Sequence, residues 1–223
     1  MTDVSALCDD HPMTNVFPDT ELQSRRLLLR PFTAADVHDT QASCVDELTQ
    51  RWLPLPQPYT LENAEAWCTR VAHALRAKGD GIHFAVTDLV GGRLLGTVGL
   101  KKTDWRAQTS EVGYWISPWA RGSGVAAEAT GVVARWLLVE QRFERLELRA
   151  AVENVASCKT AVRARFQREG VLRNAGFVHS GRIDVVVFSR IRGDLDPAPG
   201  PGDSEAAHAS AGAAQPLGTG GKS

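Results

Sequence analysis

The spacing of apolar residues along the chain predicts short strands that alternate with amphipathic helices. A strand is indicated where a short run is mostly apolar, or alternates between apolar and polar residues, and turn residues bound it. Such a run begins at Arg26 and is stopped by Pro31. The predicted strands cover residues 26–32, 82–87, 93–100, 110–116, 145–152, 166–172 and 184–191.

Apolar positions that recur every three or four residues predict the helices. The clearest stripe covers residues 61–75, and Gly79 is placed to end that helix. Thr33 and Thr60 each precede a helical stretch and are followed three residues later by a polar side chain, which is typical of a capping box. Residues 52–58 are too rich in proline for regular structure and predict an ordered loop. The predicted helices begin at Thr33 and cover residues 60–78, 123–140 and 154–165.

The order of these elements indicates the fold class. Consecutive strands between residues 82 and 116 are joined by short turns, which predicts an antiparallel meander. The path from the strand at 110–116 through a helix to the strand at 145–152 needs a crossover, so those two strands are expected to be parallel. The order β-α-α-β-β-β-α-β-α-β-β therefore predicts an α/β fold of the α+β type, with a mixed, mostly antiparallel central sheet flanked by helices.

The two ends of the chain differ from its middle. Residues 196–223 are mostly Pro, Gly, Ala, Ser and charged residues, which predicts a disordered tail because little apolar area is available for burial. The tail ends in Gly218–Ser223, which resembles half of a phosphate-binding loop but lacks the leading glycine and the flanking strand and helix. Residues 1–20 are expected to be a loosely ordered extension, and residues 21–195 to form one domain.

The charge balance argues against a nucleic-acid or membrane partner. Basic residues number 25 and acidic residues 26, for a net charge of −1, so no overall positive field attracts nucleic acid or an anionic membrane. No apolar run approaches the ~20 residues that span a bilayer, and the N-terminus lacks a secretory signal. Four cysteines without CxxC spacing indicate free thiols rather than a zinc site or disulfides. We expect a cytoplasmic protein without a metal.

A turn rich in glycine carries the main chemical signal of the sequence. Arg121 opens a Gly-Ser-Gly turn that separates the strand at 110–116 from the helix at 123–140. The first N–H groups of a helix have no partner within it, and the helix dipole is positive at this end. Glycine lets an anion approach the backbone closely. The turn therefore predicts a site for a phosphate-bearing ligand.

Four segments in this order resemble the GNAT acetyltransferase superfamily, and within it the RimJ/RimL-like branch of ribosomal-protein N-terminal acetyltransferases. The resemblance covers residues 21–195, nearly the whole predicted domain. The segment at 121–126 fits the family signature for the diphosphate of coenzyme A (CoA). The resemblance implies that the fourth and fifth strands, at 110–116 and 145–152, splay apart to admit the cofactor. The matching segments are residues 27–32, 111–118, 121–126 and 153–173.

The resemblance implies that the chain binds acetyl-CoA as its co-substrate and transfers the acetyl group to an amine. The diphosphate is expected on the N–H groups of residues 122–126, with positive charge from Arg121. The pantetheine arm is expected to pair with the end of the fourth strand, and Asn154 to contact it from the fifth. The implied cofactor-binding residues are Trp115, Ile116, Ser117, Arg121, Gly122, Ser123, Gly124, Val125, Ala126 and Asn154.

Three side chains are candidates for proton transfer. An amine attacks only when it is neutral, and Glu111 could accept its proton directly or through water. Tyr114 is an alternative acceptor, and a plain structural carboxylate is the other interpretation of Glu111. Ser157 matches the position where relatives carry a hydroxyl near the thioester sulfur, and could protonate the leaving thiolate. Its alternative role is to cap the first turn of its helix.

The sequence does not identify the amine that receives the acetyl group. The resemblance suggests a protein N-terminus, although relatives also acetylate small amines, and the chain is expected to be a monomer or a homodimer. Trp52, Pro54 and Tyr59 are candidates to line the acceptor site, and His83 to face it. The family usually has Gly-Phe at the end of this helix, but this chain has Arg165 before Phe. Arg165 either adopts the strained left-handed conformation or ends the helix differently, and it puts a cation near the expected mouth of the cofactor channel.

Two other functions also stay open. Residues 122–127 fit the looser G-x-G-x-x-A dinucleotide pattern, which would indicate an oxidoreductase, but that pattern belongs in a repeated βαβ unit. The second alternative is a catalytically weak acyl-CoA-binding sensor or partner protein with the same fold.

Overall fold

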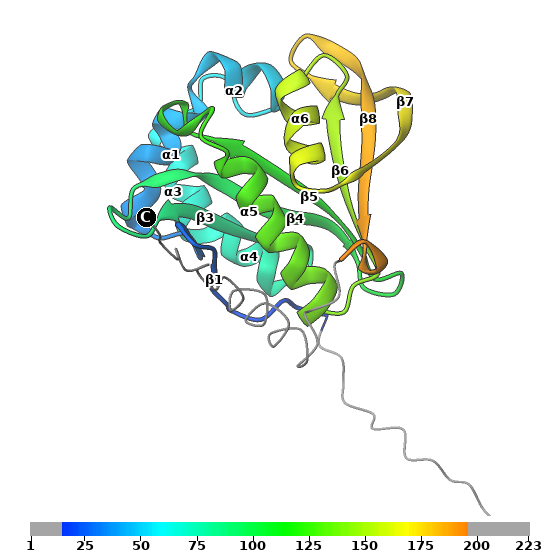
Figure 1. The fold of residues 1–223 in the computed structure, drawn as a ribbon. Coiled ribbons are helices and arrows are strands. Elements are labelled where there is room, and N and C mark those ends of the chain that lie inside the picture. Colours follow the sequence, from blue (N-terminus) through cyan, green and yellow to red (C-terminus); the bar gives the residue numbers. More distant parts are fainter. Residues whose placement is uncertain (1–14, 196–223) are drawn as a thin grey trace, which may run out of the picture. The chain divides into compact units, whose positions relative to one another are not determined.

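One eight-stranded sheet runs through residues 15–195, which are the residues that the computed structural model describes (Figure 1). Its strand order is β1-β2-β3-β4-β5-β6-β8-β7. Every neighbouring pair is antiparallel except β5 and β6, which are parallel. The predicted mixed, mostly antiparallel fold is confirmed. The strands are β1 (Leu22–Gln23), β2 (Leu27–Arg30), β3 (Ile82–Asp88), β4 (Leu94–Asp104), β5 (Thr109–Ile116), β6 (Arg145–Ala151), β7 (Gln167–Val178) and β8 (Gly181–Ile191).

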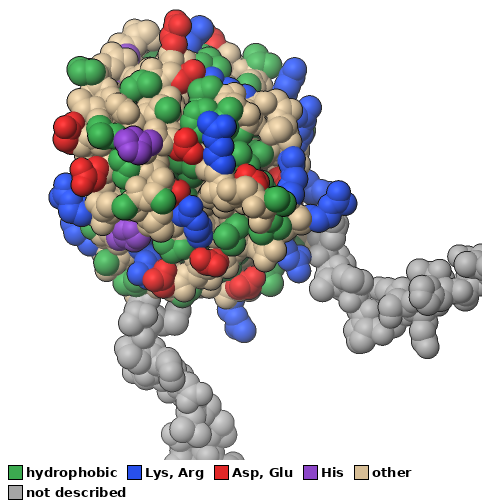
Figure 2. Space-filling view, turned by 90° about the vertical axis from the view of Figure 1, so that its left-hand side faces the viewer, with side chains coloured by type: hydrophobic (Ala, Val, Ile, Leu, Met, Phe, Trp, Pro, Cys, Tyr) green, Lys and Arg blue, Asp and Glu red, His purple; other side chains and the backbone are tan. Residues whose placement is uncertain are grey.

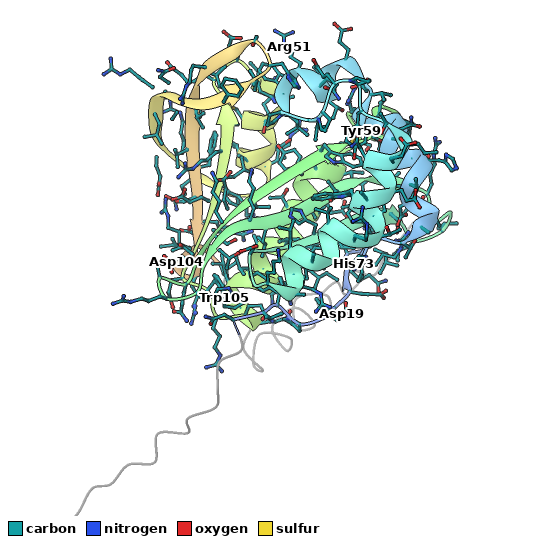
Figure 3. The ribbon with its side chains drawn as sticks, turned by 180° about the vertical axis from the view of Figure 1, so that it is seen from behind. Asp19, Arg51, Tyr59, His73, Asp104 and Trp105 are labelled. Atoms are coloured by element: carbon teal, nitrogen blue, oxygen red, sulfur yellow. The ribbon has the colours of Figure 1, made fainter. Side chains whose placement is uncertain are left out.

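Helices lie on both faces of this sheet. In Figure 1, α5 crosses in front of β4 and β5 with α6 beside it, whereas α3 and α4 lie behind the sheet. Figure 3 shows the reverse side, with Tyr59 just before α3 and His73 on α4. The helical segments are η1 (Ala34–Asp36), α1 (Val37–Cys44), α2 (Glu47–Trp52), α3 (Leu61–Ala66), η2 (Trp67–Val71), α4 (Ala72–Ala77), η3 (Pro118–Ala120), α5 (Val125–Arg135), η4 (Trp136–Glu140), α6 (Val155–Arg163) and η5 (Arg192–Asp194).

The parallel pair β5–β6 separates part of the way along its length. Pairing runs from Thr109 opposite Arg145 to Val112 opposite Leu148 and then stops. Beyond that point β5 remains paired with β4, and β6 remains paired with β8. The two strands therefore diverge, as the resemblance implied.

Local sequence signals correctly located most helix starts. The predicted capping boxes at Thr33 and Thr60 are both present, and Gly79 adopts a left-handed conformation (φ 77°) after α4. Two π-helical segments, η2 and η4, join α3 to α4 and extend α5. The prediction missed β1 and α2, and α2 contains Trp52, which we had expected in an irregular loop.

Packing extends to residues before the predicted domain boundary at residue 21. Phe17 is completely buried. Its ring lies against Trp105, Trp136 and Phe143, with centroids 4.6, 5.6 and 5.7 Å away. The rest of the expected N-terminal extension up to residue 14, and the expected tail at 196–223 with Gly218–Ser223, lie outside the described residues.

Arg165 adopts the left-handed conformation, which was one of the two possibilities for this helix end. Its φ is 63°, and the N–H of Phe166 donates to the carbonyl of Ala161 to close the end of α6. A residue with a side chain pays about 1–2 kcal/mol for this backbone shape. Arg165 is not among the residues that line the cleft described below, and its expected position near the cofactor channel stays a prediction.

Replacing Arg165 with Gly should therefore stabilise the fold. We expect Arg165→Gly to raise the free energy of unfolding by about 0.5–1 kcal/mol, because strain relief exceeds the larger chain entropy of glycine. Arg163→Gly, in the last turn of α6, should instead lower it by about 1 kcal/mol. Urea denaturation measures both, and a loss of stability in Arg165→Gly would contradict the strain argument.

Candidate functional site

A cleft of about 670 Å³ opens where β5 and β6 diverge. One wall consists of residues 48–54, from α2 and the segment after it. The opposite wall is formed by α6 and by residues of β7 and β8, and the N-terminus of α5 closes one end. Among the described residues, this cleft contains most of the predicted site. The predicted residues that line it are Glu111, Tyr114, Trp115, Ile116, Arg121, Gly122, Gly124, Val125, Ala126, Asn154 and Ser157.

The turn before α5 presents free backbone donors to the cleft. Gly122 and Gly124 have φ values of 77° and 80°, which only glycine adopts readily. The first N–H group paired with this turn is that of Glu128, which donates to the carbonyl of Gly124. Within residues 15–195, no backbone bond is recorded for the N–H groups of residues 122–127. An added Cβ at Gly122 would meet nothing within 4 Å, so a ligand has room there. The turn therefore has the backbone geometry of an anion site.

Arg121 is paired with α2. Its guanidinium group donates to Asp46 at 2.5 Å and to Thr49 at 2.9 Å. Asp46 also accepts from the N–H of Thr49 and so caps α2. The hydrogen bond from Arg121 holds the pKa of the Asp46 carboxyl below its usual value, against the opposing effect of burial. Arg121 thus fastens α2 to the turn through Nη2, while it also lines the cleft, and its direct role toward a phosphate stays a prediction.

Tyr114 and Ser157 form a hydroxyl pair inside the cleft. Their oxygens are 2.8 Å apart. Asn154 caps α6, because its side-chain oxygen accepts from the N–H of Ser157 at 3.0 Å. This cap fixes the first turn of α6 and with it the Ser157 hydroxyl. Burial raises the pKa of Tyr114, so its hydroxyl stays protonated and can donate near neutral pH.

Glu111 lies on the opposite face of β5 from Tyr114, as strand alternation requires for residues three positions apart. Its side chain is only 9% exposed, and its oxygens lie 3.0 Å from Lys101 Nζ and 2.9 Å from Lys102 Nζ. Arg149 Nε lies 3.7 Å away. Burial alone would raise the pKa of Glu111, but the two lysines outweigh it and the net shift is downward. The carboxylate is therefore ionised near neutral pH, and its basicity is reduced.

Two predicted cofactor-binding residues do not line the cleft. Ser117 is completely buried, its N–H donates to the carbonyl of Leu95, and its hydroxyl accepts from Ser43. Ser123 is exposed, and its hydroxyl donates to the carbonyl of Ala120. Ser117 follows the last residue of β5, where the chain turns into η3, so its side chain packs inward instead of continuing the strand edge.

The candidate acceptor residues separate into two groups. Trp52 and Pro54 line the cleft, whereas Tyr59 is buried in a core cluster with Phe32 and Val37 and does not reach it. His83 lines a separate small cavity near His73. Burial, and then the charge of Lys101, lower the pKa of His83 to about 4. The expectations that Tyr59 and His83 would face the acceptor were wrong.

Sequence reasoning missed the basic side chains of the cleft and the contribution of the β7–β8 hairpin. Lys101 is directly opposite Glu111 in the β4–β5 register, and cross-strand pairing could have suggested it. The others become neighbours only through the tertiary fold. The missed residues are Lys101, Lys102, Arg149, Lys159, Arg163, Ala175, Gly176, Phe177, Val178, Ile183 and Val185.

No helix among residues 15–195 is long and apolar enough to cross a membrane. The same residues contain no group of three or more potential ligands that could hold a metal ion. The sheet within them has a single parallel pair, whereas a dinucleotide-binding fold repeats its parallel βαβ unit.

Comparison with known proteins identifies relatives of the chain. Residues 26–167 match the family model described as an acetyltransferase (GNAT) domain. The uncharacterised N-acetyltransferase YoaA of Bacillus subtilis is 26% identical over 171 residues, which cover 77% of this chain and 96% of YoaA. The ribosomal-protein-serine acetyltransferase of Escherichia coli is 26% identical over 98 residues, which cover 44% of this chain and 55% of that protein.

A solved structure gives the same fold. RimL, a ribosomal L7/L12 α-N-protein acetyltransferase in complex with coenzyme A, aligns with a TM-score of 0.70 at 21% identity. The alignment covers 79% of this chain and 100% of RimL. At this level of identity the likeness concerns the fold.

The Arg121–Asp46 contact generates a prediction about stability. Asp46→Ala removes both the α2 cap and the partner of Arg121, and should lower the free energy of unfolding at pH 7 by about 1–2 kcal/mol. Asp46→Asn keeps a capping oxygen and should lose only about 0.5 kcal/mol.

The pH dependence separates the two contributions. Because the folded pKa of Asp46 is depressed, its charge contributes stability above the unfolded carboxyl pKa of about 3.9, and this contribution disappears as the pH falls through the folded pKa. Urea denaturation of both variants at pH 7 and at acid pH tests this. Equal losses for the two variants at pH 7 would rule out the separate cap.

Proposed function

Because the chain belongs to the GNAT acetyltransferase family, whose model matches residues 26–167, we propose that it moves an acetyl group from acetyl-CoA to the N-terminal amine of a protein or peptide. The family makes the chain an acyltransferase. The finer assignment rests chiefly on one observation, which is a cleft that ends at free helix amides and contains the Tyr114–Ser157 hydroxyl pair.

The residues that would hold acetyl-CoA fit its chemistry. The N–H groups at 122–127 suit the diphosphate, and the missing Cβ of Gly122 leaves open space beside them. Beyond Val112, β5 has lost its partner on the β6 side, so its backbone edge near Trp115 and Ile116 is open to the amide groups of the pantetheine arm. Acetyl-CoA supplies the activated thioester.

The reaction needs one proton acceptor and one proton donor. The amine nitrogen forms a bond to the thioester carbonyl carbon, the carbon–sulfur bond breaks, and the amine loses a proton while the thiolate gains one. In our proposal Glu111 takes the amine proton and the Tyr114–Ser157 pair supplies the thiolate proton. The two sets lie on opposite faces of β5, so acceptor and donor can approach the same carbonyl from opposite sides of the sheet. Holding the reactants together supplies much of the rate.

Two features support a protein or peptide acceptor. The cleft lies between the residue 48–54 wall and the β7–β8 hairpin, and exposed apolar side chains are found on both sides, including Leu48 at 45% and Phe177 at 63% exposure. Such walls suit the side chains of an extended peptide. The names of a sequence relative and of the RimL structure also point to ribosomal-protein acetyltransferases.

Removal of the hydroxyl pair tests the proposal. The full chain, incubated with acetyl-CoA and a panel of peptides and small amines, should yield N-terminally acetylated peptide by mass spectrometry. Tyr114→Phe and Ser157→Ala should each lower kcat by about 10–100-fold, with acetyl-CoA affinity changed less than about threefold by calorimetry. Tyr59→Phe alters the other tyrosine, which is buried outside the cleft, and serves as the matched control. Failure to bind acetyl-CoA, or to acetylate any amine, would refute the function.

The pH profile tests the role of Glu111. Its lowered pKa keeps it ionised throughout the neutral range, so the acidic limb of kcat/KM should reflect the acceptor α-amine, with a pKa of about 7.7–8.0. Glu111→Gln should lower kcat/KM by about 100-fold without moving this limb. Glu144→Gln, which alters an ion-paired carboxylate outside the cleft, should change it less than about twofold. A limb that moves in Glu111→Gln would assign the titration to Glu111 instead.

A further inference from the structure

The cleft is strongly basic although the chain as a whole is nearly neutral. Of the charged side chains that line it, six are basic and one, Glu111, is acidic. Figure 2 shows another face of the molecule, where acidic and basic side chains are interspersed. The lining of the cleft therefore has a larger excess of positive charge than the chain as a whole. The basic residues are Lys101, Lys102, Arg121, Arg149, Lys159 and Arg163.

Three of these cations gather around Glu111, where the acceptor amine would lose its proton. They are Lys101, Lys102 and Arg149, at 3.0, 2.9 and 3.7 Å from the carboxylate. Arg149 is also bound by Glu147, with Nη2 2.9 Å from the carboxylate. Three cations thus share two carboxylates, Glu111 and Glu147. Glu147 also accepts from Arg145, so the local charge remains positive.

Both lysines are accessible to a ligand. Their side chains are 48% and 67% exposed, whereas Glu111 between them is 9% exposed. A Cβ added at Gly113 would lie 3.4 Å from Lys101 Nζ, so this ammonium group lies over bare backbone one residue beyond the last β5–β6 pair. Because Gly113 has no side chain, Lys101 and a ligand can occupy the space above the diverging strands.

We propose that Lys101 and Lys102 select an acceptor with a carboxylate close to its amine, such as a peptide with Asp or Glu at its first or second position. This inference rests on the proposed function, because it places the acceptor amine at Glu111. An extended residue spans about 3.3–3.6 Å, so the side chains of the first two residues start within roughly 7 Å of the lysines when the amine is at Glu111. The same charges repel a second cation on the acceptor, which disfavours polycationic small amines.

Matched peptides test this selection. Peptides that differ only in Glu, Gln or Lys at the second position are assayed with the full chain and acetyl-CoA at low and high salt. We expect kcat/KM to decrease in the order Glu, Gln, Lys, with about a tenfold or larger ratio between Glu and Lys. The ratio should shrink at high ionic strength because both lysines are partly exposed. Equal rates, or a preference for Lys, would overturn the inference while leaving the transferase function in place.

Removal of the lysine charges tests whether Lys101 and Lys102 cause the preference for an acidic acceptor. In the double variant Lys101→Gln with Lys102→Gln, the Glu-to-Lys ratio should fall toward one, and acetyl-CoA affinity should be retained. Lys78→Gln, an exposed residue outside the cleft, should keep the full ratio. An undiminished ratio in the double variant would show that other groups select the acceptor. If no peptide is acetylated by the unmodified chain, the proposed function itself fails.

Discussion

The separation of β5 from β6 after the Val112–Leu148 pair is the constraint on which the rest of the site depends. Buried backbone groups must be hydrogen-bonded, so a sheet cannot open at its centre without other partners. Here each strand keeps its outer neighbour, β4 for β5 and β8 for β6, and only the edges that face each other are released. These edges lie near the N-terminus of α5, whose first N–H groups are free. They also lie near the start of α6, where the N–H of Ser157 donates to Asn154. The cleft therefore lies where the facing edges of two central strands have no neighbouring strand.

Strand alternation then divides the chemistry between the two faces of the sheet. Glu111 and Trp115 point to the face covered by the cluster that contains Tyr59, whereas Tyr114 points to Ser157 on α6. A thioester reached through the gap would have a proton donor on one side and a carboxylate on the other. The cations around Glu111 reduce its strength as a base. The same cations would lower the pKa of an amine held beside them, since a positive neighbour disfavours the ammonium form, and this effect offsets part of the loss.

The sequence predicted the features that depend on local signals and failed where tertiary contacts decide. Capping at Thr33 and Thr60, the glycine turn before α5 and the parallel crossover all follow from short patterns, and all are present. In contrast, α2 has only six residues, too few to be stable alone, and it depends on the contact between Asp46 and Arg121. The Tyr114–Ser157 bond joins residues 43 positions apart, and no local periodicity encodes that proximity. The sequence also did not show that Ser117 would be buried outside the cleft. β5 ends at Ile116, and the chain turns into η3 after Ser117.

The contact between Arg121 and Asp46 also alters the interpretation of the family signature. An arginine in this signature is expected to attract the phosphate of the ligand directly. In this chain the Arg121 side chain is already paired with Asp46 and is only 30% exposed. Its effect on the ligand would be indirect, because it joins the turn that carries the free amides to α2, whose end supplies Trp52 to the other wall. Movement of either wall would strain a charge-assisted hydrogen bond, which is about twice as strong as a neutral one. The turn before α5 and the wall that α2 supplies are therefore joined by one side chain.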